Sequence, residues 1–159
     1  MPKLDIGKAP LRTGSIYPAP YAAQMEGRSS RRLGQAAGLT QFGANLVTLE
    51  PGAVASLRHA HAREDEFAWV TEGELVLEED AGETVMVAGD CAAWPAGTGL
   101  AHRLVNRSAS LARFLVVGTS HPEEVATYPD DDMILHREGG ANRLTHLDGT
   151  PWTGPKEAT

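Results

Sequence analysis

The stretch GAVASLRHAHAREDEFAWVTEG, residues 52–73, holds the most informative pattern in the chain. His59 and His61 stand two residues apart, and side chains two apart on a β-strand point to the same face. Glu66 follows across a short break that can bring its carboxylate back toward both imidazoles. Imidazoles and a carboxylate directed at one point suit a divalent transition metal ion, so this stretch predicts part of a metal site.

The stretch GDCAAWPAGTGLAHRLVN, residues 89–106, adds a third imidazole, that of His102. Each piece alone is a weak signal, because an H-x-H often marks two surface histidines and a lone histidine is more often structural. Glu66 closes an acidic run that would by itself indicate a solvated turn. The spacing of the whole set, rather than any single residue, therefore carries the interpretation.

The region around these stretches has the rhythm of short strands. From residue 40 to residue 118, runs rich in Val, Leu, Phe and Trp alternate with breaks that contain Gly and Pro. Many short strands with this punctuation are typical of an antiparallel sandwich or barrel. The pattern predicts strands at 41–50, 54–61, 66–72, 74–79, 84–87, 91–94, 101–106 and 111–117.

Together, the two stretches resemble the paired motifs of the cupin family. The first reads G-x6-H-x-H-x4-E-x6-G over residues 52–73, and the second reads G-x5-P-x-G-x4-H-x3-N over residues 89–106. The chain departs from the family pattern by one extra residue before the first histidine and two before the last, where loop length can vary. The resemblance implies an all-β, double-stranded β-helix (jelly-roll) barrel with a metal bound inside by His59, His61, Glu66 and His102.

Three parts of the chain can be separated by pattern. Residues 1–39 hold several prolines and no clear periodicity, which predicts an irregular or partly extended N-terminal arm. Residues 40–118 are the expected barrel core, and residues 119–159 are a C-terminal extension expected to pack on it. Within the extension, residues 120–124 have the Pro and acids of a short helix start, and residues 144–147 could add a strand. Its Tyr-Pro-Asp and Asp-Gly-Thr-Pro stretches are similar to those of bacterial single-domain cupins of the conserved-barrel type.

Composition narrows the class of protein. The chain has 159 residues, 42% of them hydrophobic and 22% charged, as in an ordinary globular domain. A net charge of −7 argues against nucleic acid or an anionic membrane as partner. The single cysteine, Cys91, excludes an intrachain disulfide and fits a reducing cytoplasm. No apolar window approaches the roughly 18 residues of a membrane span, and no signal peptide opens the chain, so we expect a cytoplasmic protein.

The expected cofactor is one divalent transition metal ion: Fe, Mn, Ni, Co or Zn. Three neutral imidazoles and one carboxylate leave such an ion with a net charge of about +1. A positive, open site favours a small anionic, chelating molecule as ligand.

The chemistry is less well defined than the site. Strand alternation places mostly apolar side chains inward, and no inward Arg or Lys is evident to hold a phosphate, which counts against a sugar-phosphate isomerase. No second acid is evident, although Gln41, Asn45 and Tyr128 could reach the pocket. An apolar pocket favours a dioxygenase acting on a small organic acid or aromatic. The alternatives are a non-enzymatic binding or sensing protein and, third, a metal-dependent decarboxylase or isomerase.

Two aromatic side chains are expected on the outer face of the barrel. Alternation from Glu66 turns Phe67 and Trp69 away from the interior. Large exposed apolar patches are uncommon on monomers, so these residues predict a covered surface or a homodimer.

Overall fold

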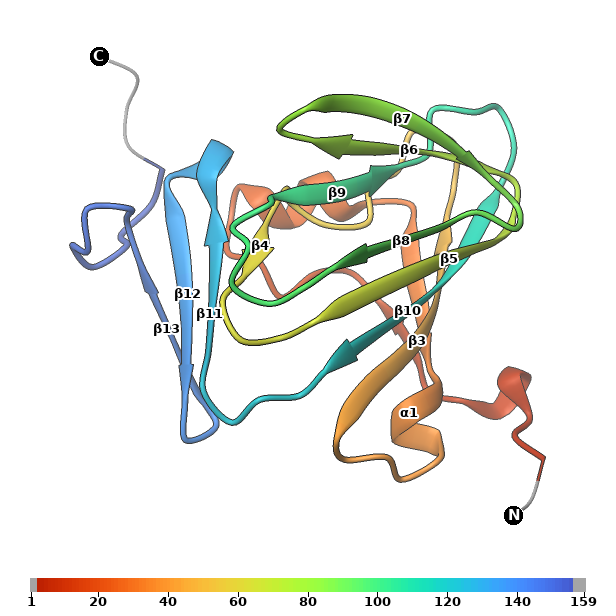
Figure 1. Cartoon of the computed structure of the whole chain (residues 1–159), viewed down its shortest axis with the longest axis horizontal. Coiled ribbons are helices and arrows are strands. Elements are labelled where there is room, and N and C mark those ends of the chain that lie inside the picture. The colour runs from red at the N-terminus through yellow and green to blue at the C-terminus, as the bar shows by residue number, and fades with distance from the viewer. Residues whose placement is uncertain (1–2, 156–159) are drawn as a thin grey trace.

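The computed structural model describes residues 3–155 and is built almost entirely of antiparallel strands (Figure 1). Its short helical segments are η1 (Ile6–Lys8), η2 (Tyr21–Met25), α1 (Leu33–Ala36) and η3 (Pro129–Asp131). The first strands are β1 (Leu11–Thr13), β2 (Arg28–Arg32), β3 (Phe42–Leu49), β4 (Ala60–His61), β5 (Glu66–Glu72), β6 (Glu74–Glu79) and β7 (Gly82–Val87). The remaining strands are β8 (Cys91–Trp94), β9 (His102–Val105), β10 (Ala112–Thr119), β11 (Glu124–Tyr128), β12 (Met133–Glu138) and β13 (Ala141–Thr145).

Two sheets enclose the main core. One has the strand order β1-β2-β3-β10-β5-β8, and the other has the order β7-β6-β9. Their inner faces bury a continuous cluster that includes Val47, Val70, Leu75, Leu104 and Phe114. Burying side chains of this size stabilises the fold by roughly 1.5–3 kcal/mol each.

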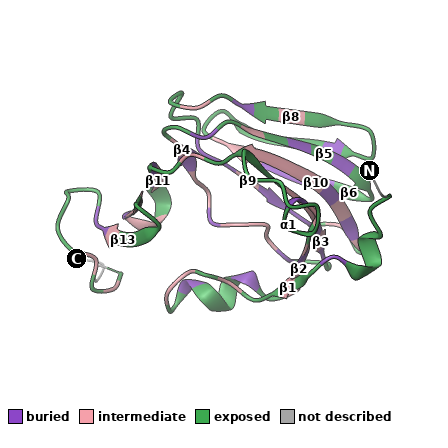
Figure 2. Ribbon diagram, turned by 90° about the horizontal axis from the view of Figure 1, so that it is seen from below, coloured by how far each residue is buried: buried purple, intermediate pink, exposed green. Residues whose placement is uncertain are grey.

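Period-two patterning explains why the predicted strands form where they do. Ala68 and Val70 on β5 are buried, whereas Phe67 and Trp69 between and beside them are exposed by 41% and 43%. Figure 2 shows this alternation of buried and exposed positions along β5. Strands β5, β6 and β8 have the bounds that the sequence predicts.

The strand predicted at 54–61 is mostly absent. Only β4 forms a ladder there, and residues before it make isolated bridges, Val54 with Val105 and His59 with His102. The bridge at His59 is closed by hydrogen bonds in both directions between the backbones of His59 and His102, 3.0 and 2.9 Å long. These bonds bring the two motifs together at one end of the barrel.

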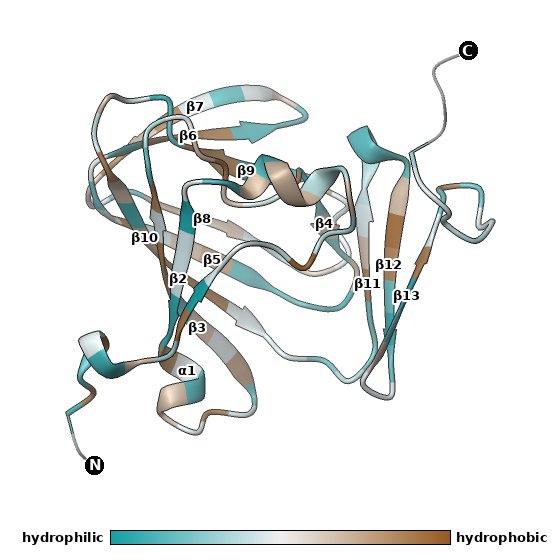
Figure 3. Ribbon diagram, turned by 180° about the vertical axis from the view of Figure 1, so that it is seen from behind, coloured by the Kyte–Doolittle hydropathy of each residue, from teal (hydrophilic) through white to brown (hydrophobic). Residues whose placement is uncertain are grey.

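The N-terminal arm is more ordered than an irregular segment. Strand β1 pairs with β2, and β2 pairs with β3 from Arg28↔Leu49 to Arg32↔Asn45, so both extend the large sheet. Between them, Tyr21 and Met25 pack with Leu57 and Tyr128 in a second buried cluster. Figure 3, a view from behind, shows the arm running across the barrel toward the sheet of β11, β12 and β13.

The helix predicted at 120–124 is wrong, because Glu124 begins strand β11. Strand β11 pairs with β12 over its whole length and with β4 through Ala126↔His61 and Thr127↔Ala60. The predicted strand at 144–147 exists but lies earlier, as β13. None of the helices among residues 3–155 is long and apolar enough to cross a bilayer.

Candidate metal centre

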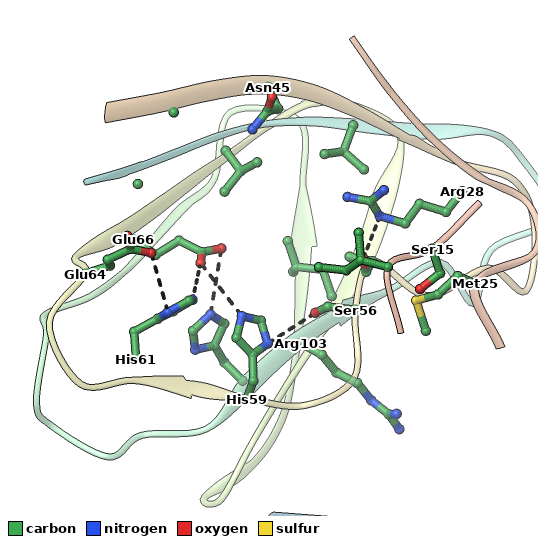
Figure 4. Close-up of a pocket in the computed structure, with 18 of the residues that line it drawn as sticks. Ser15, Met25, Arg28, Asn45, Ser56, His59, His61, Glu64, Glu66 and Arg103 are labelled. Atoms are coloured by element: carbon green, nitrogen blue, oxygen red, sulfur yellow. Dashed lines mark hydrogen bonds and ion pairs between the residues drawn. The ribbon is translucent and has the colours of Figure 1, made fainter. Parts of the chain in front are cut away.

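Three imidazoles and one carboxylate meet inside the barrel (Figure 4). The Nε2 atoms of His59 and His61 lie 3.9 and 3.2 Å from Glu66 Oε2. The Nε2 atom of His102 lies 3.8 Å from the other carboxylate oxygen, Oε1. The structure thus brings together all four residues that the sequence singles out.

Backbone carbonyls orient two of the imidazoles. His59 Nδ1 lies 2.9 Å from the carbonyl oxygen of Leu57, and His102 Nδ1 lies 3.3 Å from that of Leu100. A ring whose Nδ1–H donates to a carbonyl leaves Nε2 with its lone pair, which is the form that binds a metal ion. Among residues 3–155, the buried Nε2 of His102 also has no hydrogen-bond partner. This donor set fits a divalent transition metal ion.

Two carboxylates lie near the third imidazole, although neither makes a hydrogen bond to its Nδ1. His61 Nδ1 lies 3.5 Å from Glu124 Oε1 and 4.0 Å from Glu64 Oε2. Glu124 is itself held by the backbone N–H groups of Ala62 and Arg63, which donate to its two oxygens over 2.9 and 3.0 Å. A carboxylate behind a metal-binding histidine fixes the tautomer and makes the ring a better ligand.

Aromatic rings pack against the cluster from two sides. Trp94 stacks on His102, and its Nε1–H donates to Glu79 Oε1 over 2.8 Å. Tyr128 stacks on His59 with ring centroids 5.7 Å apart, and Tyr17 from the arm meets Tyr128 edge-on. These contacts hold the imidazoles in place without using their nitrogen atoms.

The charges of the cluster suit a cation. Burial lowers the pKa of His59 to about 4, so the ring is neutral at pH 7. Burial would raise the pKa of Glu66, but the imidazoles of His102 and His61 beside the carboxylate hold that pKa well below its usual range. The cluster therefore presents a neutral His59 beside an ionised carboxylate.

A cavity of about 410 Å³ opens beside the cluster, within the size range of small-molecule sites. Part of its wall is apolar, as expected, and includes Val47, Leu104 and Phe114. Of the three additional residues expected to reach it, Asn45 lines the cavity and Tyr128 stacks on His59. Gln41 is exposed and is not part of the lining.

The expectation of a cavity without basic residues is wrong. Four arginines line it: Arg12, Arg28, Arg103 and Arg137. The acid that the sequence did not reveal is Glu64, which also lines the cavity and is 9% exposed. Strand alternation could not find Arg12 or Arg28, because both come from the arm, where no periodic pattern shows which side chains face inward.

Comparisons with known proteins agree with this architecture. A cupin domain model matches residues 45–118. The structure of a cupin-superfamily sugar phosphate isomerase from Silicibacter pomeroyi is 55% identical, with a TM-score of 0.93 over 96% of this chain and 97% of that chain. A protein proposed to be a sugar phosphate isomerase, from Acidithiobacillus ferrooxidans, is 25% identical, with a TM-score of 0.74 over 86% and 95%.

More distant similarity extends to the fold alone. The polyketide cyclase RemF from Streptomyces resistomycificus is 22% identical, with a TM-score of 0.60 over 76% of this chain and 80% of that chain. A search of curated proteins gives no match.

The strand order, the paired motifs and the 55% identical relative define the class of protein. The chain belongs to the cupin superfamily, and the predicted all-β jelly-roll fold is confirmed.

Proposed function

We propose that this protein is a metal-dependent isomerase of a small sugar or sugar phosphate, with the metal ion bound by His59, His61, Glu66 and His102. The observation that carries the proposal is the convergence of three Nε2 atoms on Glu66 beside a cavity of ligand size. The name of the 55% identical relative, a sugar phosphate isomerase, supports the choice of reaction. Among the three functions considered from sequence, the similarity to this relative favours the isomerase over the dioxygenase.

The chemistry of an aldose–ketose isomerisation needs no oxidant and no leaving group. One hydrogen moves between neighbouring carbons and one between their oxygens, so atoms and electrons balance within the substrate. A bound divalent ion would act as a Lewis acid toward the carbonyl oxygen. The protein must supply a group that carries the proton.

Glu64 is our candidate for that group. Its Oε1 accepts hydrogen bonds from Arg137 Nη1 and from the backbone N–H of His121, at 2.9 and 2.8 Å. Those two bonds fix the carboxyl group in the cavity wall and leave Oε2 to exchange a proton. A positioned general base typically contributes 10²–10⁴-fold to the rate.

Tyr17 and Tyr128 supply a second, different contribution. Burial raises the pKa of both hydroxyls, so both stay protonated at neutral pH. Tyr17 also lines the cavity, where a protonated phenol can donate a hydrogen bond to a substrate oxygen.

The test combines metal analysis with an isomerase assay. Protein purified without added metal should contain about one divalent ion per chain and interconvert aldose and ketose forms in a panel of sugars and sugar phosphates followed by ¹H NMR. His61→Ala should lose both metal and turnover, whereas Glu64→Gln should keep the metal and lose turnover. His136→Ala is the matched control, because His136 bonds to Thr145 in the C-terminal sheet. A metal-loaded protein that isomerises nothing in the panel, yet consumes oxygen in the presence of organic acids, would contradict the isomerase proposal and support the dioxygenase.

A homodimer and a cytoplasmic location remain part of the proposal. Phe42, Phe67 and Trp69 are exposed by 39–43%, and Phe42 and Phe67 border one apolar groove. Light scattering of the purified protein tests the dimer, and a monomer at micromolar concentration would exclude it.

A further inference from the structure

We propose that Arg28, assisted by Arg12, binds the phosphate group of the substrate, so that the N-terminal arm selects phosphorylated sugars. This inference rests on the proposed function for the nature of the substrate. It adds a specificity-determining residue that lies outside both metal-binding motifs.

The first observation is how Arg28 is held. Its Nε donates a hydrogen bond of 2.6 Å to the carbonyl oxygen of Ala55, which fixes the plane of the guanidinium. Within residues 3–155, its two Nη atoms have no hydrogen-bond or ion-pair partner in the protein. Burial lowers the pKa of Arg28, yet a guanidinium stays charged in proteins. Arg28 thus presents two free Nη atoms, with four N–H donors, and an uncompensated charge to the cavity.

The second observation is a contrast with the other arginines of the same cavity. Arg103 pairs with Glu78 at 2.5 Å, and Arg137 pairs with Glu64 at 2.9 Å. No carboxylate among the described residues pairs with Arg28 or Arg12. The charge of Arg12 instead acts on Arg28 as a like charge. Two neighbouring cations without an acid form a site that a dianion would stabilise.

The third observation is position. Figure 4 shows the guanidinium of Arg28 extending into the cavity from the side opposite His61. Tyr17, Arg28 and Glu66 all line this one cavity. A ligand with metal-binding oxygens at one end and an anionic group at the other would match both ends. A guanidinium fork pairs with phosphate oxygens in a bidentate manner.

A binding experiment tests this assignment with inorganic phosphate as the probe. Calorimetry should show phosphate binding to the full-length protein, both as purified and after removal of metal by a chelator. Persistence after chelation separates phosphate held by arginine from phosphate held by a metal ion. Arg28→Gln should weaken phosphate binding by about tenfold to a hundredfold, the range for a charged hydrogen bond, and Arg28→Lys by less. Acetate, as a monoanion, should bind more weakly than phosphate.

Arg32→Gln is the matched control. Arg32 lies on the same strand, is exposed, and does not line the cavity. The Arg32→Gln variant should bind phosphate with an affinity within about twofold of the wild type, since exposed charges contribute little. All variants should keep the same metal content. Unchanged phosphate affinity in Arg28→Gln, with a native melting curve, would overturn the inference.

Kinetic measurements distinguish a failure of the phosphate site from a failure of the proposed isomerase function. With a phosphorylated sugar, Arg28→Gln should raise KM by about tenfold or more and change kcat little, because Arg28 acts at the remote end of the substrate. With the unphosphorylated sugar, wild type and variant should have equal kcat/KM. Equal efficiency of the wild type on both sugars would refute the phosphate site and leave the isomerase intact. Phosphate binding that depends on Arg28, without turnover of any sugar, would support the phosphate site and refute the isomerase function.

Discussion

The indole ring of Trp94 lies flat against the imidazole of His102, with ring centroids 3.7 Å apart and planes 6° apart. Trp94 ends strand β8, and His102 begins strand β9, so the stack joins the two sheets at the site. Both residues belong to the second motif, and the contact ties the packing of the core to the orientation of one imidazole.

Removing the indole should therefore affect stability and metal binding together. Trp94→Ala should lower the free energy of unfolding by about 3–5 kcal/mol, the usual cost of a buried Trp-to-Ala change. Metal affinity should fall about tenfold or more, because the ring of His102 is no longer held. Urea denaturation and chelator competition measure the two effects. Trp69→Ala, which alters an exposed indole, is the control, and equal metal affinity in the two variants would contradict the prediction.

The carboxylate of Glu124 is expected to act on the metal ion through His61. Glu124→Gln keeps the shape but places an amide NH₂ against a backbone N–H or against His61 Nδ1. We expect metal affinity to fall by about 10–100-fold, as for other partners of metal-binding histidines. Isothermal titration with the metal alone measures it. Glu123→Gln, an exposed neighbour paired with Arg63, should bind metal normally.

Gly73 combines a left-handed backbone with a close approach. Its φ is +77°, and a Cβ there would lie 2.7 Å from the carbonyl oxygen of Leu111. Gly52 also has a positive φ, +83°, but a Cβ there would meet nothing within 4 Å. Gly52→Ala should cost about 1–2 kcal/mol of unfolding free energy from conformation alone. Gly73→Ala should cost clearly more, and equal melting temperatures would show that the neighbouring strand yields without strain.

Acid should weaken one ion pair in a defined pH window. Arg58 donates two hydrogen bonds to Asp130, 2.8 and 2.7 Å long, and thereby holds the pKa of Asp130 below its usual 3.8, with a smaller effect from Arg103. Asp131, the adjacent acid, instead has its pKa raised, first by burial and then by the charge of Asp130.

Because the folded-state pKa of Asp130 is lowered, its stabilisation is complete above about pH 4 and is lost as the pH falls through that lowered value. The difference in unfolding free energy between wild type and Asp130→Asn should be constant from pH 5 to 7 and shrink below pH 4. Its size should stay within about 1 kcal/mol, because the carboxylate is half-exposed. A difference that grows on acidification would contradict the assignment.

Local pattern was sufficient for most of the barrel strands, although not for the one predicted at 54–61, and the spacing of the two motifs was sufficient for the four converging side chains. Val70 and Ala68 alternate with exposed residues, and this period appears in the sequence itself. The position of Glu124 could not be found in the same way. Its neighbours have the acids and proline of a helix start, but its carboxylate instead accepts hydrogen bonds from the backbone N–H groups of Ala62 and Arg63, 62 and 61 residues away in the chain.

The sequence also could not show which side chains of the N-terminal arm face the cavity. Arg28 and Tyr17 have no periodic context, so their direction depends on the pairing of β2 with β3 and on packing against Tyr128. Such contacts join residues far apart in sequence. They explain why the histidine-rich end of the cavity was predictable and its basic end was not.

The division of the cavity between two parts of the chain has a consequence for how such proteins diversify. The four converging side chains come from residues 59–102, whereas Arg12, Tyr17 and Arg28 reach the cavity from the segment before β3. Substitutions in that leading segment can change which molecules the cavity accepts while the four converging side chains stay unchanged. If the proposed function holds, grafting the leading segments of relatives onto one barrel would yield a series of proteins with the same four converging side chains and different ligand preferences.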